Sequence, residues 1–108
     1  MTIKRILVGV DGSSYSRAAL EWAASLASAT GAEVVAVHAV GLLEQLEGDA
    51  PVPAQSHRDE IRHLFERQWC APLDAAGVRS RRVLRDGPPV LALRAAADEV
   101  DADLVVVG

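Results

Sequence analysis

Short apolar segments alternate along this chain with longer segments of helical character. The segments 3–10, 33–40, 80–85 and 104–107 are predicted to be strands. The second and fourth are apolar almost throughout, which is typical of strands covered on both faces in a parallel sheet. The third is weaker, because arginines surround its few apolar residues. The pattern therefore predicts four strands in a parallel sheet.

The first connecting segment is predicted to be a helix that ends near Thr30. An Asp-Gly turn closes the first strand, and the hydroxyl groups of Ser13 and Ser14 can cap the helix that follows. The segment is rich in alanine, which favours a helix, and Gly31 provides a stop at its C-terminus.

Two further helices are expected between the remaining strands. The segment 41–56 contains glycines and prolines and is expected to be a long connection. Apolar residues then recur at helical spacing from Ile61 to Ala76, and Pro72 within that pattern is expected to kink or split the helix. Pro89 suits the first position of a last helix before the fourth strand.

The alternation of strands and helices predicts an α/β fold with right-handed crossovers and the strand order 3-2-1-4. The third strand then lies at an edge, where its arginines discourage pairing with other chains. Apolar strand residues are expected to be almost fully buried: Leu7, Val35, Val37, Leu104 and Val106. Apolar helix residues are expected to cover the sheet: Leu20, Leu26, Leu64 and Phe65.

Ligands of open parallel sheets bind at the carboxyl ends of the strands, where the winding direction reverses. In this strand order the reversal lies between the first and fourth strands, so that Val10-Asp11-Gly12 and Val107-Gly108 face one crevice. Asp11 can hydrogen-bond a ligand there, or it can organise the turn before the helix. The second reading is favoured, because Asp is common in such turns.

Other polar residues have simpler structural explanations. Ser13 and Ser14 can touch a phosphate at a helix N-terminus, but capping explains them. His38 lies within an apolar strand, so a core histidine is favoured over a catalytic one. An acidic corner that can hold a cation is more simply an exposed charged surface: Asp98, Glu99, Asp101 and Asp103. No catalytic residue and no metal ligand is predicted.

Composition narrows the class of protein. A chain of 108 residues allows a single domain, 1–108. The formal charge of -4 argues against a nucleic-acid partner, because binding to phosphates needs a basic surface. No apolar stretch approaches the roughly 20 residues of a membrane span, and no signal peptide is recognisable, so a cytoplasmic protein without a membrane partner is expected. The motifs GxxxxGK(S/T), GxGxxG, HExxH and GxSxG are absent.

Three stretches of the sequence carry a family resemblance. They are IKRILVGVDGSSYSRAALEWAASLA, then EVVAVHAV, then DGPPVLALRAAADEVDADLVVVG. In this order they resemble the universal stress protein family over nearly the whole chain, with a loose match only over 41–80. The opening ILVGVDGS with SxxAL and the closing DADLVVVG are specific in combination.

The resemblance implies a three-layer sandwich of the Rossmann-like, adenine nucleotide α-hydrolase-like type, with a fifth strand that this sequence lacks. It also implies a homodimer that binds ATP or AMP, with Mg²⁺ accompanying ATP, and that has a regulatory role in the stress response. At most weak ATP hydrolysis is implied. Transferred residue by residue, the nucleotide site lies at the ends of the first, second and fourth strands: Gly9, Val10, Asp11, Ala39, Val107 and Gly108.

The phosphate motif of the family is Gly, two residues, Gly, nine residues, then Gly and Ser or Thr. Only its first glycine has a counterpart, Gly108, so the domain is expected to be incomplete at its C-terminus and to expose an apolar strip beside the first helix.

ATP binding therefore follows from the resemblance alone. A family member that binds no nucleotide and acts as a dimeric scaffold is the alternative. A receiver domain, which needs clustered acids beside Asp11, and an adenylate-forming enzyme, which needs a Ser-Gly-Gly loop there, are disfavoured.

Overall fold

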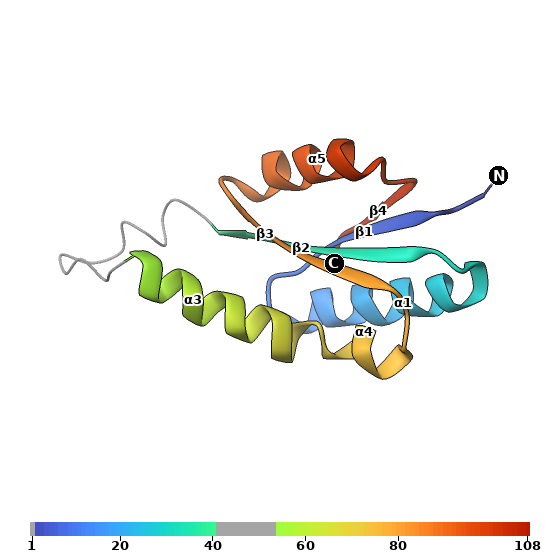
Figure 1. Ribbon diagram of the computed structural model, residues 1–108, viewed down its shortest axis with the longest axis horizontal. Helices are drawn as coiled ribbons and strands as arrows, with labels where there is room; N and C mark the ends of the chain where they lie inside the picture. Colours follow the sequence, from blue (N-terminus) through green and yellow to red (C-terminus); the bar gives the residue numbers. More distant parts are fainter. Residues whose placement is uncertain (1, 41–53) are drawn as a thin grey trace.

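The computed structural model describes residues 2–40 and 54–108, so most of the connection expected over 41–56 lies outside the described residues. Four parallel strands form one sheet in the order β3-β2-β1-β4 (Figure 1). The strands are β1 (Arg5–Gly9), β2 (Glu33–Val40), β3 (Ser80–Asp86) and β4 (Leu104–Val106). The predicted parallel arrangement and strand order are confirmed.

Helices cover both faces of the sheet and give the molecule three layers (Figure 1). One face carries α1 (Ser14–Thr30), α3 (Ala54–Leu64), the π-helical turn η1 (Phe65–Trp69) and α4 (Ala71–Ala76). The other face carries α5 (Pro89–Val100), because a right-handed crossover from β3 back to β4 must pass on the opposite side. Among the described helices, none is long and apolar enough to cross a membrane.

The helix boundaries follow the local signals in the sequence. The Ser13 hydroxyl accepts a hydrogen bond from the Ser16 N–H at 3.1 Å and caps α1. Gly31 ends α1 in the left-handed conformation, with φ at 78°. The expected break near Pro72 is present as the turn η1, after which Pro72 occupies the first turn of α4, where no helical N–H is required.

The core has two parts, one on each face of the sheet. On the α5 side, Leu7, Val35 and Val37 are buried as predicted and pack with Ala96. On the α1 side, the core includes Leu20 and Phe65 together with further strand and helix residues.

The expectations for β4 are partly wrong. Leu104 and Val106 pack against the α1-side core but are only partly buried, because β4 lies at the edge of the described sheet. Val105 is the register partner of Leu7 and therefore points to the α5 face, where it is 47% exposed; Val107 is 65% exposed. Exposed apolar side chains thus lie on β4 beside α5 and also on α1, where Tyr15 is 75% and Trp22 is 55% exposed.

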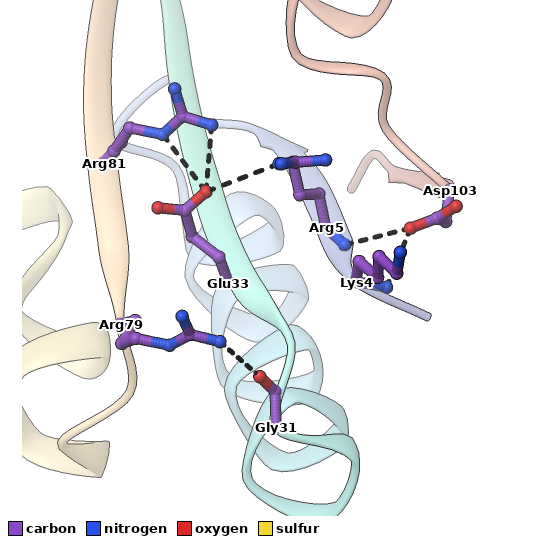
Figure 2. A network of polar contacts seen from close by, with 7 residues as sticks. All are labelled: Lys4, Arg5, Gly31, Glu33, Arg79, Arg81 and Asp103. Atoms are coloured by element: carbon purple, nitrogen blue, oxygen red, sulfur yellow. Dashed lines mark hydrogen bonds and ion pairs between the residues drawn. The ribbon is translucent and has the colours of Figure 1, made fainter. Parts of the chain in front are cut away.

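Polar contacts join the amino ends of the strands (Figure 2). The Asp103 carboxylate accepts hydrogen bonds from the backbone N–H groups of Lys4 at 2.8 Å and Arg5 at 3.0 Å. Glu33 lies between the guanidinium groups of Arg81, at 2.9 Å, and Arg5, at 3.9 Å. The contacts of Asp103 tie β1 to β4, and those of Glu33 tie β2 to both of its neighbours.

The Asp103 contacts predict a specific loss of stability in acid. The N–H groups of Lys4 and then Arg5 hold the pKa of Asp103 below its usual range. The stabilisation is therefore present above the unfolded pKa of about 3.9 and disappears as the pH falls through that value and the lower folded pKa. Urea denaturation between about pH 6 and pH 3 should show a smaller loss of stability for Asp103→Asn than for the parent.

The control is Asp98→Asn, on the exposed side of α5, which should behave like the parent. If the free energy of unfolding falls equally with pH in all three proteins, this account is contradicted.

Candidate functional site

A pocket of about 240 Å³ opens at the carboxyl ends of β1, β2 and β4, beside the N-terminus of α5. It lies where the winding direction of the sheet reverses, as expected for an open parallel sheet. The structure brings all six residues named from the sequence to this one pocket: Gly9, Val10, Asp11, Ala39, Val107 and Gly108. Their role in binding stays a prediction.

Gly9 keeps the floor of the pocket open. A Cβ atom at this position would lie 3.1 Å from Leu93 Cδ1 of α5 and 3.7 Å from Val107 Cγ1. The missing side chain therefore leaves space between the end of β1, the first turns of α5 and the end of β4.

Gly108 lets the end of the fourth strand approach α1 closely. A Cβ atom there would lie 2.5 Å from the carbonyl oxygen of Tyr15 and 3.0 Å from the Ser16 nitrogen. Both atoms belong to the backbone of the first helical turn, which cannot move aside cheaply. A glycine at this position therefore brings the pocket and the N-terminus of α1 together.

Asp11 organises the turn between β1 and α1. Its Oδ1 atom accepts a hydrogen bond from the Ser13 N–H at 2.8 Å, and its own N–H donates to Ser16 Oγ at 3.3 Å. Hydrogen bonds from the hydroxyl and the N–H of Ser13 hold the pKa of Asp11 below its usual range, so the carboxylate is charged near neutral pH. The turn role favoured by the sequence is present, and an exposed carboxylate also lies at the rim of the pocket.

Ala39 contributes backbone groups to the pocket. In a parallel strand, successive residues direct their N–H and C=O groups to opposite neighbours. The Val34 N–H and the Val40 C=O bond to the β3 side, whereas the Val37 C=O bonds to the Val10 N–H on the β1 side. The N–H and C=O of Ala39 therefore point toward the end of β1, beyond the last register pair, Gly9 and Val37.

The model of the universal stress protein family matches residues 2–108 of this chain. The chain belongs to the universal stress protein family. A comparison with curated protein sequences gives no match.

Solved structures of universal stress proteins resemble this domain along at least 98% of its length. A universal stress protein in complex with cAMP is 30% identical, with a TM-score of 0.78, over 100% of this chain and 77% of that chain. A family member from Burkholderia pseudomallei is 29% identical, with a TM-score of 0.79, over 98% of this chain and 81% of its own. The universal stress protein from Archaeoglobus fulgidus in complex with dAMP is 25% identical, with a TM-score of 0.72, over 100% and 82%.

The pocket of this universal stress protein domain is also lined by residues that were not predicted from the sequence. Pro89 and Leu93 come from the first turns of α5, and Ser16, Val37 and His38 complete the lining. Pro89 and Leu93 are four residues apart and therefore share one face of the helix. This spacing is the sequence signal that could have indicated that both residues line the pocket. Their position over the ends of β1 and β4 depends on the path of the crossover.

The other candidate residues of this universal stress protein domain have structural contacts. The His38 residue is 7% exposed, and its ring packs against the tilted ring of Phe65 and in a T-shaped arrangement with Trp69, as expected for a core histidine. In the acidic corner, Asp103 binds backbone N–H groups and Glu99 pairs with Arg85 at 2.6 Å. Within the described part of the chain, no group of three potential metal-ligating side chains occurs.

Proposed function

We propose that this universal stress protein domain binds an adenine nucleotide in the pocket at the ends of β1, β2 and β4. The supporting observation is the backbone of Ala39, which presents a donor and an acceptor to the pocket beside a small side chain. Adenine carries an amino donor next to a ring-nitrogen acceptor on its pairing edge, and proteins read that edge with hydrogen bonds. The cAMP and dAMP complexes of related proteins support the same class of ligand.

The lining of the pocket suits the base and the ribose. Its walls are mostly small or apolar, and the Asp11 carboxylate at the rim can accept a hydrogen bond from a ribose hydroxyl or an amino group. No lysine or arginine is among the lining residues, so phosphates would bind through backbone N–H groups near Gly108 and α1. ATP with Mg²⁺ is the larger ligand implied by the family, and AMP is the smaller one.

Calorimetric titration with AMP, ATP plus Mg²⁺, and GMP tests the proposal. AMP should bind and GMP should not, because guanine reverses the donor and acceptor that would face Ala39. The absence of binding by both AMP and ATP would favour the alternative, a scaffold that binds no nucleotide.

We also propose, from family membership, that the protein is a cytoplasmic homodimer with a regulatory role rather than an enzyme. Sedimentation equilibrium of the protein, with and without AMP, tests the dimer. A single monomeric species over the whole concentration range would contradict it.

Replacement of Asp11 separates its ligand role from its turn role. Asp11→Ala should weaken AMP binding by about 1–3 kcal/mol, the usual effect of losing a hydrogen bond to a charged group. Asp11→Asn keeps an oxygen for the Ser13 N–H and should preserve the turn, while the loss of charge still weakens binding. Urea denaturation of both variants reports the turn, and titration with AMP reports the ligand contact. Unchanged affinity in a folded Asp11→Ala protein would remove Asp11 from the site.

A further inference from the structure

The backbone ladder between β1 and β2 stops one step short of the pocket. Its last hydrogen bond runs from the Val10 N–H to the Val37 C=O at 2.8 Å. In a continuing parallel ladder, the next bond would run from the Ala39 N–H to the Val10 C=O. The described backbone does not form that bond. The Val10 carbonyl oxygen instead lies 2.7 Å from Nδ1 of the His38 ring.

This contact requires a proton on one particular nitrogen of the ring, Nδ1. A carbonyl oxygen only accepts hydrogen bonds, so Nδ1 of His38 must carry the proton and donate it. In the neutral ring Nε2 is then an acceptor, and within the described residues it has no hydrogen-bond partner. The ring is held by the bond to Val10 and by aromatic packing, with its centroid 5.0 Å from that of Trp69 at an interplanar angle of 77°.

We propose that His38 is a positioning residue that keeps the next step of the ladder open. By drawing the Val10 carbonyl oxygen toward its Nδ1–H group, the ring keeps this acceptor out of line with the Ala39 N–H, which is left free to face a ligand in the pocket. Without this donor, the Val10 carbonyl and the Ala39 N–H would be two unpaired groups at the end of adjoining strands. Buried backbone groups rarely stay unpaired, so these two groups would bond to each other. That bond would extend the ladder and remove the donor from the pocket.

Two nearly isosteric variants isolate the hydrogen bond. His38→Leu removes the donor, and His38→Asn supplies an amide N–H at about the place of Nδ1. Should the leucine variant fail to fold, His38→Phe removes the donor with a ring that still packs against Trp69. Circular dichroism and thermal unfolding establish that each protein is folded before it is compared.

Amide hydrogen exchange without nucleotide is the first measurement, and it does not depend on the proposed function. The Ala39 N–H, measured relative to the Val37 N–H of the same protein, should exchange about tenfold more slowly in His38→Leu than in the parent, the factor for gaining one ordinary hydrogen bond. His38→Asn should resemble the parent. An unchanged or faster relative rate in His38→Leu would overturn the inference.

Titration with AMP is the second measurement, and this part rests on the proposed function. His38→Leu should bind AMP about tenfold more weakly than the parent, and His38→Asn should restore most of the affinity. Equal affinity of His38→Leu and parent would overturn the positioning role. If the parent itself does not bind AMP, the proposed function fails, and the exchange rates alone decide whether His38 holds the ladder open.

Discussion

Ala39→Phe should abolish binding of AMP while leaving the sheet folded. Ala39 lines the pocket from β2 on the face that α5 covers, together with Val37, and the whole space measures about 240 Å³. A phenylalanine ring there would occupy the volume that the base needs. Ala39 is only partly buried, so the larger side chain can extend toward the opening without disrupting the core. Calorimetric titration should therefore give no measurable heat of binding.

The matched control is Ala39→Gly, which keeps both the space and the backbone groups of this position. It should retain AMP binding, apart from a small effect of added flexibility. Far-ultraviolet circular dichroism and the denaturation midpoint establish that both variants are folded. Binding of AMP by a folded Ala39→Phe protein with the affinity of the parent would place the nucleotide site elsewhere.

Leu7→Ala should reduce the free energy of unfolding by about 2–5 kcal/mol. Leu7 is completely buried in the central strand β1 and packs with Val35, Val37 and Ala96 between the sheet and α5. Removing its side chain leaves a cavity that the neighbouring strands cannot close. Denaturation with guanidinium chloride measures the change directly.

Val105→Ala is the control for this prediction, because Val105 is the register partner of Leu7 but is 47% exposed on the edge strand. Its loss should be smaller than about 1 kcal/mol, since little buried surface disappears. A loss below about 1 kcal/mol for Leu7→Ala would mean that α5 does not cover the sheet as the structure shows.

Much of the fold could be predicted because the signals are local. Ser13 caps α1, Gly31 ends it and Pro72 marks the break before α4, all through contacts within a few residues of the chain. The predicted crossovers depended on a rule that holds across proteins, their right-handedness, and the predicted strand order agrees with the placement of a charged strand at an edge.

The burial of β4 was predicted less well. Leu104 and Val106 are as apolar as the residues of β2, yet they are only partly buried, because β4 lies at the edge of the described sheet. Apolar character reports what a residue can bury, and the neighbours decide whether it does.

The sequence by itself determined the α/β class, the strand order and the end of the sheet at which a ligand would bind. It also placed Asp11 in a turn, because Asp and the residues that follow it favour that geometry wherever they occur. These properties depend on the backbone preferences and the polarity of neighbouring residues.

Only the tertiary structure decided how the pocket is closed and which groups remain open in it. The position of Leu93 above Gly9 follows from the path of α5 across the sheet, and the contact between His38 and the Val10 carbonyl joins β2 to the residue that follows β1. Such contacts depend on distances between segments far apart in the chain. The local sequence pattern does not determine those distances, because they are set by how the helices and strands pack against one another.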